Sequence, residues 1–354
     1  MKQPPMGLAR SAEQEQFAAA LHDMLTAADT PAAARRWAAG DRAPGLASWR
    51  RLAGLGVAAL AVPEKWGGLG ASPVDLVVAC EELGHHAMPG PVAESLAAVP
   101  QLLAALVDEG ICEESRCAPW LSGLAAGDLI AALAMPPRLP YAVDADVAGL
   151  VVLVDADTVW LAAPGTRHQS LDPARFLFEA RGQQVLAHGP DVAAVVARTL
   201  DLGALASAAQ LAGAGRALLE ASVRYAGQRV QFGQPIGAFQ AVKHHLADVA
   251  IALEFARPLL DAAAMALAAG DGSGDGTTAS RDVSAAKVAC ADAAHRAARV
   301  ALQVHGAIGY TQENDLSLWL TKVRALVPAW GSQAEHRGRV MAALTGKEQS
   351  SAAD

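Results

Sequence analysis

Between residues 224 and 257, a permanently charged side chain, an aromatic ring and two glycines lie close together. Arg229 precedes Phe232 by three residues, and Gly233 and Gly237 allow the backbone to turn tightly. A guanidinium holds phosphate oxygens in a two-pronged contact, and a phenyl ring offers a surface to a flat heterocycle. The segment therefore suits a phosphate joined to a flat ring, although an exposed arginine beside a core phenylalanine would explain the same residues.

Two helices are expected to position this turn, and the second of them begins near Ala238. Within it, four apolar side chains recur at spacings of 4, 3 and 4, namely Val242, Leu246, Val249 and Leu253. These side chains share one face of the helix, and such a face packs against other helices. The segment is therefore predicted to be a helical hairpin in a bundle, with the charged turn at its elbow.

A second glycine-rich segment, Gln303–Tyr310, follows another predicted helix. A helix C-cap accounts for Gly306 but not for the whole run. This segment and the pattern R-x-x-F-G-x-x-I-G-x-F-Q, from Arg229 to Gln240, resemble the acyl-CoA dehydrogenase family. The loop V-P-E-x-W-G-G-L-G within Gly56–Ser72 resembles the same family. The resemblance covers nearly the whole chain, from Phe17 to Arg337.

The resemblance implies a flavin site that is shared between subunits. In the family, the two glycine-rich turns face the FAD of a neighbouring subunit, with the arginine, the glutamine and backbone N–H groups near its pyrophosphate. The FAD-binding residues implied here are Arg229, Phe232, Gln303, Gly306 and Ala307, where Ala307 replaces a glycine of the family. They belong to the half of the site that one subunit lends to another.

The catalytic carboxylate of the family has no counterpart at either of its two positions. Acyl-CoA dehydrogenases remove the weakly acidic α proton of a thioester with a glutamate, while the β hydride passes to the flavin. By the resemblance, Trp330 occupies the usual glutamate position and Gly203 occupies the alternative one. No catalytic residue is therefore assigned. Asp201 and Glu335, two and five residues away, remain candidates for a displaced base.

The segment 127–195 predicts a small β domain that lacks the rest of a flavin pocket. In the family, a loop with a hydroxyl residue follows the first strand, and a W-x-T-N segment covers the flavin. Here Met135–Pro140 has no Thr, Ser or acidic residue, and Trp160 is not followed by Thr-Asn. Strands are predicted where Val, Ile, Phe and Trp gather between turn residues, at Leu129–Ala134, Gly149–Val154, Thr158–Ala162, Phe176–Ala180 and Gln184–Ala187.

Composition favours helices elsewhere. Of 354 residues, 53% are hydrophobic and 5% aromatic, and Ala and Leu supply much of the apolar content. A capping box at Ser11 and Gln14 opens the first predicted helix, and Pro73–His85 is another. We expect a mainly α fold with a small β middle domain, like that of acyl-CoA dehydrogenases. Its domains are an N-terminal all-α domain (1–126), a reduced β domain (127–195) and a C-terminal helical bundle (196–354).

Charge and cysteine usage argue against several other classes of protein. The formal charge is −8 and no run of Lys or Arg occurs, so nucleic-acid binding is not expected. The four cysteines lack the spacing of a zinc site or of a disulfide framework and are typical of cytosolic thiols. No uninterrupted apolar run approaches the roughly 20 residues that a membrane span needs. A cytoplasmic protein without a membrane span is expected.

Adjacent histidines occur twice, as His85-His86 and as His244-His245. Neighbours on a helix face different sides, so both pairs are interpreted as surface or interface histidines. The segment Ala268–Asp282 lacks the ligand spacing of a calcium loop and is interpreted as a polar linker. No metal site is predicted.

Three functions remain open. The favoured one is a subunit of an FAD-dependent acyl-CoA dehydrogenase that resembles the shorter, base-lacking subunits of heteromeric members. Its partner would be a homologous subunit with the catalytic glutamate, its substrate an acyl-CoA from fatty acid or steroid degradation, and its electron acceptor an electron-transfer flavoprotein, as the resemblance implies. The alternatives are an active homo-oligomer with a displaced base and a purely structural partner that binds no cofactor.

Overall fold

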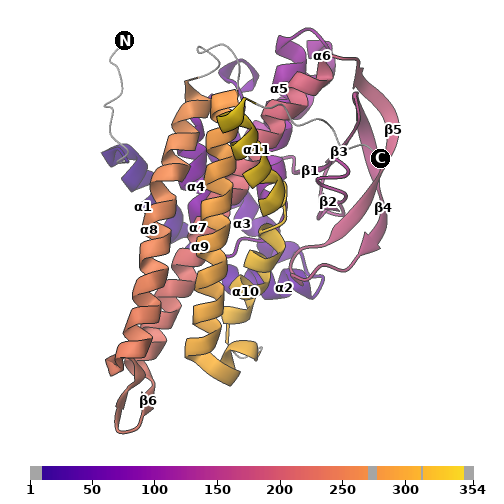
Figure 1. Ribbon diagram of the computed structural model, residues 1–354. Coiled ribbons are helices and arrows are strands. Elements are labelled where there is room, and N and C mark those ends of the chain that lie inside the picture. Colours follow the sequence, from indigo (N-terminus) through magenta and orange to yellow (C-terminus); the bar gives the residue numbers. More distant parts are fainter. Residues whose placement is uncertain (1–9, 270–276, 312–313, 347–354) are drawn as a thin grey trace.

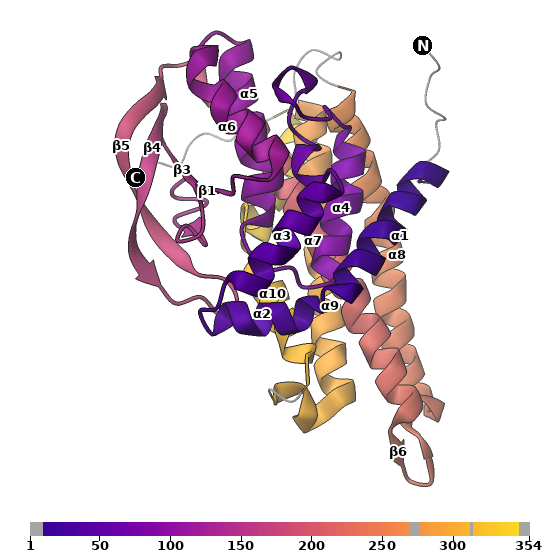
Figure 2. The same cartoon turned by 180° about the vertical axis from the view of Figure 1, so that it is seen from behind.

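The computed structural model describes residues 10–269, 277–311 and 314–346. Figure 1 shows helices of the N-terminal part, a curved sheet on one side, and the long helices of the C-terminal half. From behind, in Figure 2, the N-terminal helices lie across the bundle. One apolar core joins the three parts, and it includes fully buried side chains from each, such as Leu21, Val152 and Leu205. The fold is mainly α with a small sheet, as expected.

Local sequence signals determine where several N-terminal helices begin. The expected capping box is confirmed, because Ser11 and Gln14 exchange side-chain to backbone hydrogen bonds. Ser72 and Asp75 form a second capping box. The short helix α2 was not expected, because nine residues are too few to show a clear apolar period. The helices are α1 (Ala12–Ala27), α2 (Thr30–Ala38), α3 (Ala43–Gly54), α4 (Pro73–His85), α5 (Val99–Asp108) and α6 (Glu114–Ala126).

The middle part forms a sheet with the strand order β1-β3-β4-β5-β2. Strands β1 and β3 pair in parallel, and the other neighbours are antiparallel. The strands are β1 (Ala131–Ala134), β2 (Ala142–Val143), β3 (Leu150–Asp155), β4 (Thr158–His168) and β5 (Leu177–His188). The prediction of two strands between residues 176 and 187 was wrong. Gly182 pairs with Ala162 and continues β5, and its missing side chain leaves room for the Trp160 ring, which a Cβ would approach within 2.9 Å.

The C-terminal half is a bundle, and the expected helical hairpin is confirmed at its start. The predicted linker at 268–282 is too long, because α9 already begins at Thr277, where glycine gives way to residues that a helix tolerates; residues 270–276 lie outside the described ranges. The elements are α7 (Val192–Gln228), β6 (Val230–Gln231), β7 (Gln234–Pro235), α8 (Gln240–Ala268), α9 (Thr277–His305), α10 (Leu316–Leu326) and α11 (Gln333–Thr345).

Helix α7 is the central helix, and α4, α8 and α9 pack against it. It is long and apolar enough to cross a membrane by length and composition, yet 72% of its most apolar window is buried inside the chain. The central helix of a bundle has this composition because it is covered on all sides. Glycines allow α4 to come close, since a Cβ at Gly213 would lie 1.8 Å from the carbonyl oxygen of Glu81.

Candidate functional site

The hairpin between α7 and α8 presents its two central residues to solvent. Phe232 and Gly233 both have positive φ, 53° and 81°, as the tight two-residue turn between β6 and β7 requires. Phe232 is 92% exposed, and its ring meets that of Phe239 edge-on, with centroids 6.1 Å apart. Arg229 is also exposed. The interpretation of Phe232 as a core residue was therefore wrong.

The second glycine-rich turn lies at the same end of the bundle as this hairpin (Figure 1). Gln303, Gly306 and Ala307 are all exposed at the C-terminal end of α9. The ring of His305 stacks on Tyr225 near the end of α7, with centroids 4.3 Å apart, and this contact ties the two ends together. The structure thus gathers the five residues at one exposed end of the bundle, where none of them is covered by the chain's own described residues.

The two residues that the resemblance aligns with the family's base positions, Trp330 and Gly203, face each other in the interior. Trp330 is 2% exposed, and its indole lies directly over Gly203 of α7. A Cβ at Gly203 would come within 2.1 Å of Trp330 Cζ3. The indole therefore fills the space that a side chain at residue 203 would need.

Sequence reasoning missed Glu94, a buried carboxylate in the same region. Glu94 and Trp330 line one small cavity of about 20 Å³, together with Arg175, Gln210 and Lys322. Burial raises the pKa of Glu94, and Arg175 opposes the shift. The cavity holds about one water molecule. The sequence held one indication of this buried carboxylate, because Glu94 is the only charged residue in the apolar run from 92 to 106.

Both candidates for a displaced base are engaged elsewhere. Asp201 is buried and accepts hydrogen bonds from Arg339 Nη2 at 2.6 Å and from Ser280. Glu335 accepts a hydrogen bond of 2.7 Å from the backbone N–H of Ser332 and caps α11. This backbone hydrogen bond lowers the pKa of Glu335, so its carboxylate is a weaker base than an ordinary glutamate.

The loop after β1, Met135–Pro140, has no Thr, Ser or acidic residue. Met135 and Leu139 exchange backbone hydrogen bonds of 2.7 and 2.9 Å, which fold the loop back on itself. The family's W-x-T-N segment is not matched either, because Trp160 is followed by Leu161 and Ala162. The ring of Trp160 packs on Gly182.

One histidine pair was misinterpreted. His85 and His86 are only 9% and 7% exposed, because α1 and α7 cover the end of α4. With Glu82 and with His22 of α1, they form what we call the histidine cluster, in which one ligand atom of each residue lies within 4.8 Å of the others. Neither local spacing nor composition shows that His22 joins the pair, because it comes from a separate helix.

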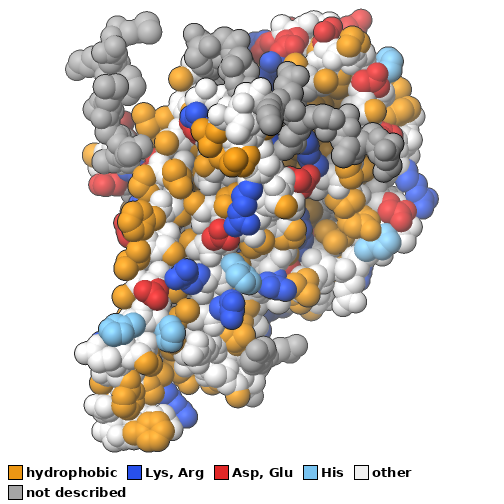
Figure 3. Space-filling model, in the orientation of Figure 1, with side chains coloured by type: hydrophobic (Ala, Val, Ile, Leu, Met, Phe, Trp, Pro, Cys, Tyr) orange, Lys and Arg blue, Asp and Glu red, His pale blue; other side chains and the backbone are white. Residues whose placement is uncertain are grey.

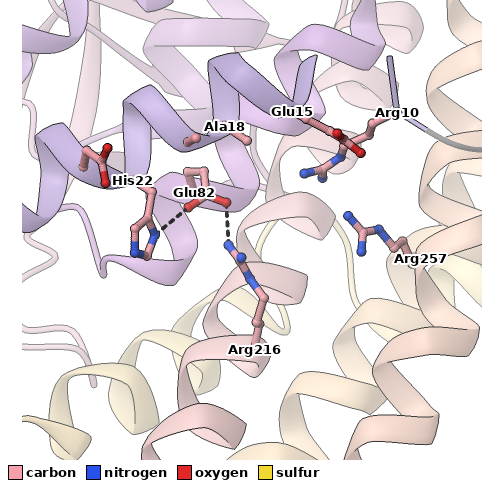
Figure 4. A pocket seen from close by; sticks show the side chains of 9 residues that line it. Arg10, Glu15, Ala18, His22, Glu82, Arg216 and Arg257 are labelled. Atoms are coloured by element: carbon pink, nitrogen blue, oxygen red, sulfur yellow. Dashed lines mark hydrogen bonds and ion pairs between the residues drawn. The ribbon is translucent and has the colours of Figure 1, made fainter. Parts of the chain in front are cut away.

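An open pocket of about 640 Å³ adjoins this cluster between α1, α4, α7 and α8. Figure 4 shows His22 and Glu82 on one side of it and Arg10, Arg216 and Arg257 on the others. The second histidine pair, on α8, is exposed as expected.

Both helical parts of the chain match known protein families. Residues 11–128 match "Acyl-CoA dehydrogenase, N-terminal domain", and residues 193–345 match "Acyl-CoA dehydrogenase, C-terminal domain". The chain is 32% identical over 295 residues to acyl-CoA dehydrogenase IpdE2 of Mycobacterium tuberculosis, covering 82% of this chain and 85% of that protein.

Two solved structures have the same fold at lower identity. Butyryl-CoA dehydrogenase from Megasphaera elsdenii gives a TM-score of 0.81 at 22% identity, over 96% of this chain and 100% of that one. A chain of the ChsE4-ChsE5 complex from Mycobacterium tuberculosis gives 0.78 at 22% identity, over 96% and 99%. On the family matches and the identity to a full-length relative, this chain belongs to the acyl-CoA dehydrogenase family.

Proposed function

We propose that this chain is the non-catalytic subunit of a heteromeric, FAD-dependent acyl-CoA dehydrogenase, and that it lends half of a flavin site to a homologous partner. The observation that carries the proposal is the contact between Trp330 and Gly203. By the resemblance, Trp330 and Gly203 stand at the two positions from which the family takes its base, and the Trp330 indole fills the space beside Gly203. The neighbouring cavity of about 20 Å³ has no room for an acyl thioester. The partner would supply the glutamate and the acyl-CoA pocket.

The residues at the exposed end of the bundle fit an FAD held from outside this chain. Arg229 offers an exposed guanidinium for pyrophosphate oxygens, and Gln303, Gly306 and Ala307 are also exposed. Phe232 is held in a left-handed conformation with its ring in solvent, an arrangement that a partner's flavin would cover. When bound, the flavin would accept the hydride from the β carbon of the substrate.

An exposed apolar face of α8 supports assembly with another subunit. Ile251, Phe255 and Leu259 recur every four residues and are 52%, 75% and 43% exposed. In Figure 3, hydrophobic side chains lie along the side of the molecule formed by α8, down to the hairpin below it. A continuous apolar face on a surface helix marks a protein contact. The ChsE4-ChsE5 relative is itself described as a complex of two proteins.

Other parts of the proposal rest on family membership. We infer that the substrate is an acyl-CoA of fatty acid or steroid degradation and that an electron-transfer flavoprotein receives the electrons. A cytoplasmic location is supported by four buried free thiols, Cys80, Cys112, Cys117 and Cys290. An active homo-oligomer is less well supported, because Asp201 and Glu335 have structural partners.

The test is to purify the chain alone and together with the glutamate-bearing homologue from the same genome. Alone, it should carry far less than one FAD per chain and should not reduce an artificial electron acceptor with acyl-CoA. The complex should be yellow and active. The Trp330→Glu variant, purified alone, should remain inactive because the rest of the pocket is missing. A yellow homo-oligomer with one FAD per chain and turnover would contradict the proposal.

A further inference from the structure

The histidine cluster brings four potential metal ligands together from two helices. His85 and His86 lie three and four residues after Glu82, so each is a neighbour of Glu82 along the helix, and His86 is the C-cap residue that ends α4. His22 of α1 completes the group. The three imidazole centroids are 4.7 to 5.2 Å apart. No residue of this cluster belongs to the proposed flavin half-site or to the base positions.

The distances within the cluster match those between ligands of one ion. His22 Nδ1 lies 3.2 Å from Glu82 Oε2 and 3.1 Å from His86 Nε2. Ligands about 2.0–2.1 Å from a zinc ion are about 3.0–3.5 Å from their neighbours. Two ligands on opposite sides of an ion are at most about 4.2 Å apart. Since the widest separation here is within 4.8 Å, a small side-chain adjustment would close the site on an ion.

Hydrogen bonds among the described residues do not provide partners for all the polar atoms of this cluster. A ring nitrogen carries at most one hydrogen, so His22 Nδ1 cannot donate a separate hydrogen bond to both Glu82 and His86. Within the described ranges, His85 Nδ1 is buried and has no hydrogen-bond partner. An unsatisfied buried polar atom is uncommon in a folded protein and calls for a specific explanation. A bound cation would accept lone pairs from several of these atoms at once.

Helix α7 supplies groups that contact and orient the ligands. Glu220 Oε2 lies 3.0 Å from His85 Nε2, which is the carboxylate to histidine contact that orients ligands at many metal sites. Arg216 Nη2 donates to Glu82 Oε1 at 2.5 Å and leaves Oε2 facing His22. Arg216 Nε also lies 3.6 Å from Glu81 Oε1, and Glu81 pairs with Arg10 as well.

The cluster can be reached from solvent. The side chain of His22 is 43% exposed. His22 and Glu82 both line the open pocket of about 640 Å³, which gives an ion a path to the cluster (Figure 4).

We propose that His22, Glu82, His85 and His86 bind one divalent first-row transition-metal ion of the Zn²⁺ type. Several imidazoles with one carboxylate suit such ions, whereas Mg²⁺ and Ca²⁺ prefer sites made of oxygen atoms. The ion joins α1 to α4 and so attaches the first helix to the body of the protein. Because the unfolded chain has no preformed site, binding raises the stability of the folded state.

The test uses the full chain, free of any affinity tag and stripped of metal with a chelator. Zn²⁺ titrated by calorimetry should bind at one ion per chain and raise the melting temperature. Co²⁺ in its place should give visible ligand-field absorption that Zn²⁺ displaces. A metal-stripped chain that shows neither a stoichiometric heat nor a rise in melting temperature with Zn²⁺ would overturn the proposal.

Two variants and a matched control locate the site. His22→Ala removes a half-exposed ligand and should leave the circular dichroism spectrum unchanged, but it should weaken Zn²⁺ binding more than tenfold and abolish the Co²⁺ absorption. His86→Gln should do the same. The control changes the exposed pair on α8, His244→Ala with His245→Ala, and should bind Zn²⁺ like the wild type. Wild-type affinity in His22→Ala, or a loss of binding in the control instead, would refute the assignment.

Discussion

At the scale of single residues, the defining pair is Trp330 and Gly203. The indole lies where any side chain at residue 203 would have to go, and Trp330 is held at a φ of 64°. That left-handed conformation costs about 1–2 kcal/mol in a residue with a Cβ. The surroundings must therefore favour this placement of the indole. A carboxylate at residue 203 would therefore need a smaller side chain at residue 330.

This dependence predicts a measurable coupling. Gly203→Ala should lower the free energy of unfolding by about 1–3 kcal/mol, because its methyl group overlaps the indole. In a Trp330→Ala background, the same substitution should cost much less. Urea unfolding of the wild type, the two single variants and the double variant gives the coupling energy between residues 203 and 330.

Gly227→Ala in the same helix is the control, because no atom lies within 4 Å of its added Cβ. It should leave stability unchanged or raise it slightly. An equal cost of Gly203→Ala in both backgrounds would show that the contact with Trp330 is not the cause.

A second residue-scale prediction concerns pH. His336 Nε2 lies 2.9 Å from the carbonyl oxygen of Trp330, and Nδ1 lies 3.1 Å from Ser284 Oγ. Burial lowers the pKa of His336 from 6.5 to about 4. Between these values the unfolded chain binds a proton that the folded chain does not, so stability should fall as the pH falls from 6.5 towards 4.

His336→Gln should reduce this loss without removing it, because burial also lowers the pKa of His305. The measurement is urea unfolding at several pH values in the presence of a chelator. A pH dependence that is identical in wild type and variant would rule out a contribution from His336.

At the scale of elements, the ends of α7 and α9 form one exposed unit. The stacked rings of Tyr225 and His305, 4.3 Å apart, hold the arginine-bearing hairpin beside the second glycine-rich turn. Both turns follow long helices, whose rigidity fixes where the exposed groups lie. This unit is what the chain would contribute to a partner's flavin.

Arg229 tests that contribution. A charge-assisted hydrogen bond to a pyrophosphate stabilises binding by about 1.5–3 kcal/mol, so Arg229→Ala should weaken FAD binding by the assembled complex about ten- to a hundredfold. Arg229→Lys should recover only part of the loss, because an ammonium group cannot make the two-pronged contact. FAD titration monitored by flavin fluorescence gives the affinities.

Arg224→Ala, another exposed arginine near the end of α7, is the control and should bind FAD like the wild type. If the Arg229→Ala complex assembles with unchanged FAD affinity, a purely structural role in the complex becomes the better interpretation.

At the scale of the whole molecule, α8 has two apolar faces. Val249 is buried within the chain, whereas Ile251, Phe255 and Leu259 point to solvent. The exposed face continues towards the hairpin that carries Phe232 (Figure 3). Assembly and flavin binding are therefore expected to share one side of the molecule.

Phe255→Asp should prevent assembly, because a partner would have to bury an unpaired charge at the centre of this face. Size-exclusion chromatography with light scattering should show the complex reduced to separate subunits, with the helical content of this chain unchanged. Leu171→Asp, which alters a 63% exposed side chain far along the chain from α8, should assemble normally. Normal assembly of Phe255→Asp would exclude this face as the contact surface.

The sequence by itself determined the features that depend on local interactions. The capping box at Ser11, the bounds of α4 and the helical hairpin at Arg229 follow from residues a few positions apart, which cap, turn or align side chains without help from the rest of the chain. The family patterns are local in the same sense, and they indicated both exposed turns.

Only the tertiary structure decided which distant residues meet. Gly182 interrupts the run of strand-forming residues, but pairing with β4 keeps β5 continuous. The contact of Trp330 with Gly203 and the approach of His22 to Glu82 and His86, 60 and 64 residues away, depend on how whole helices pack. Packing is set by the burial of many side chains at once, so no local pattern reveals it. For that reason the sequence predicted that His85 and His86 lie on the surface, whereas the packing of α1 and α7 buries them.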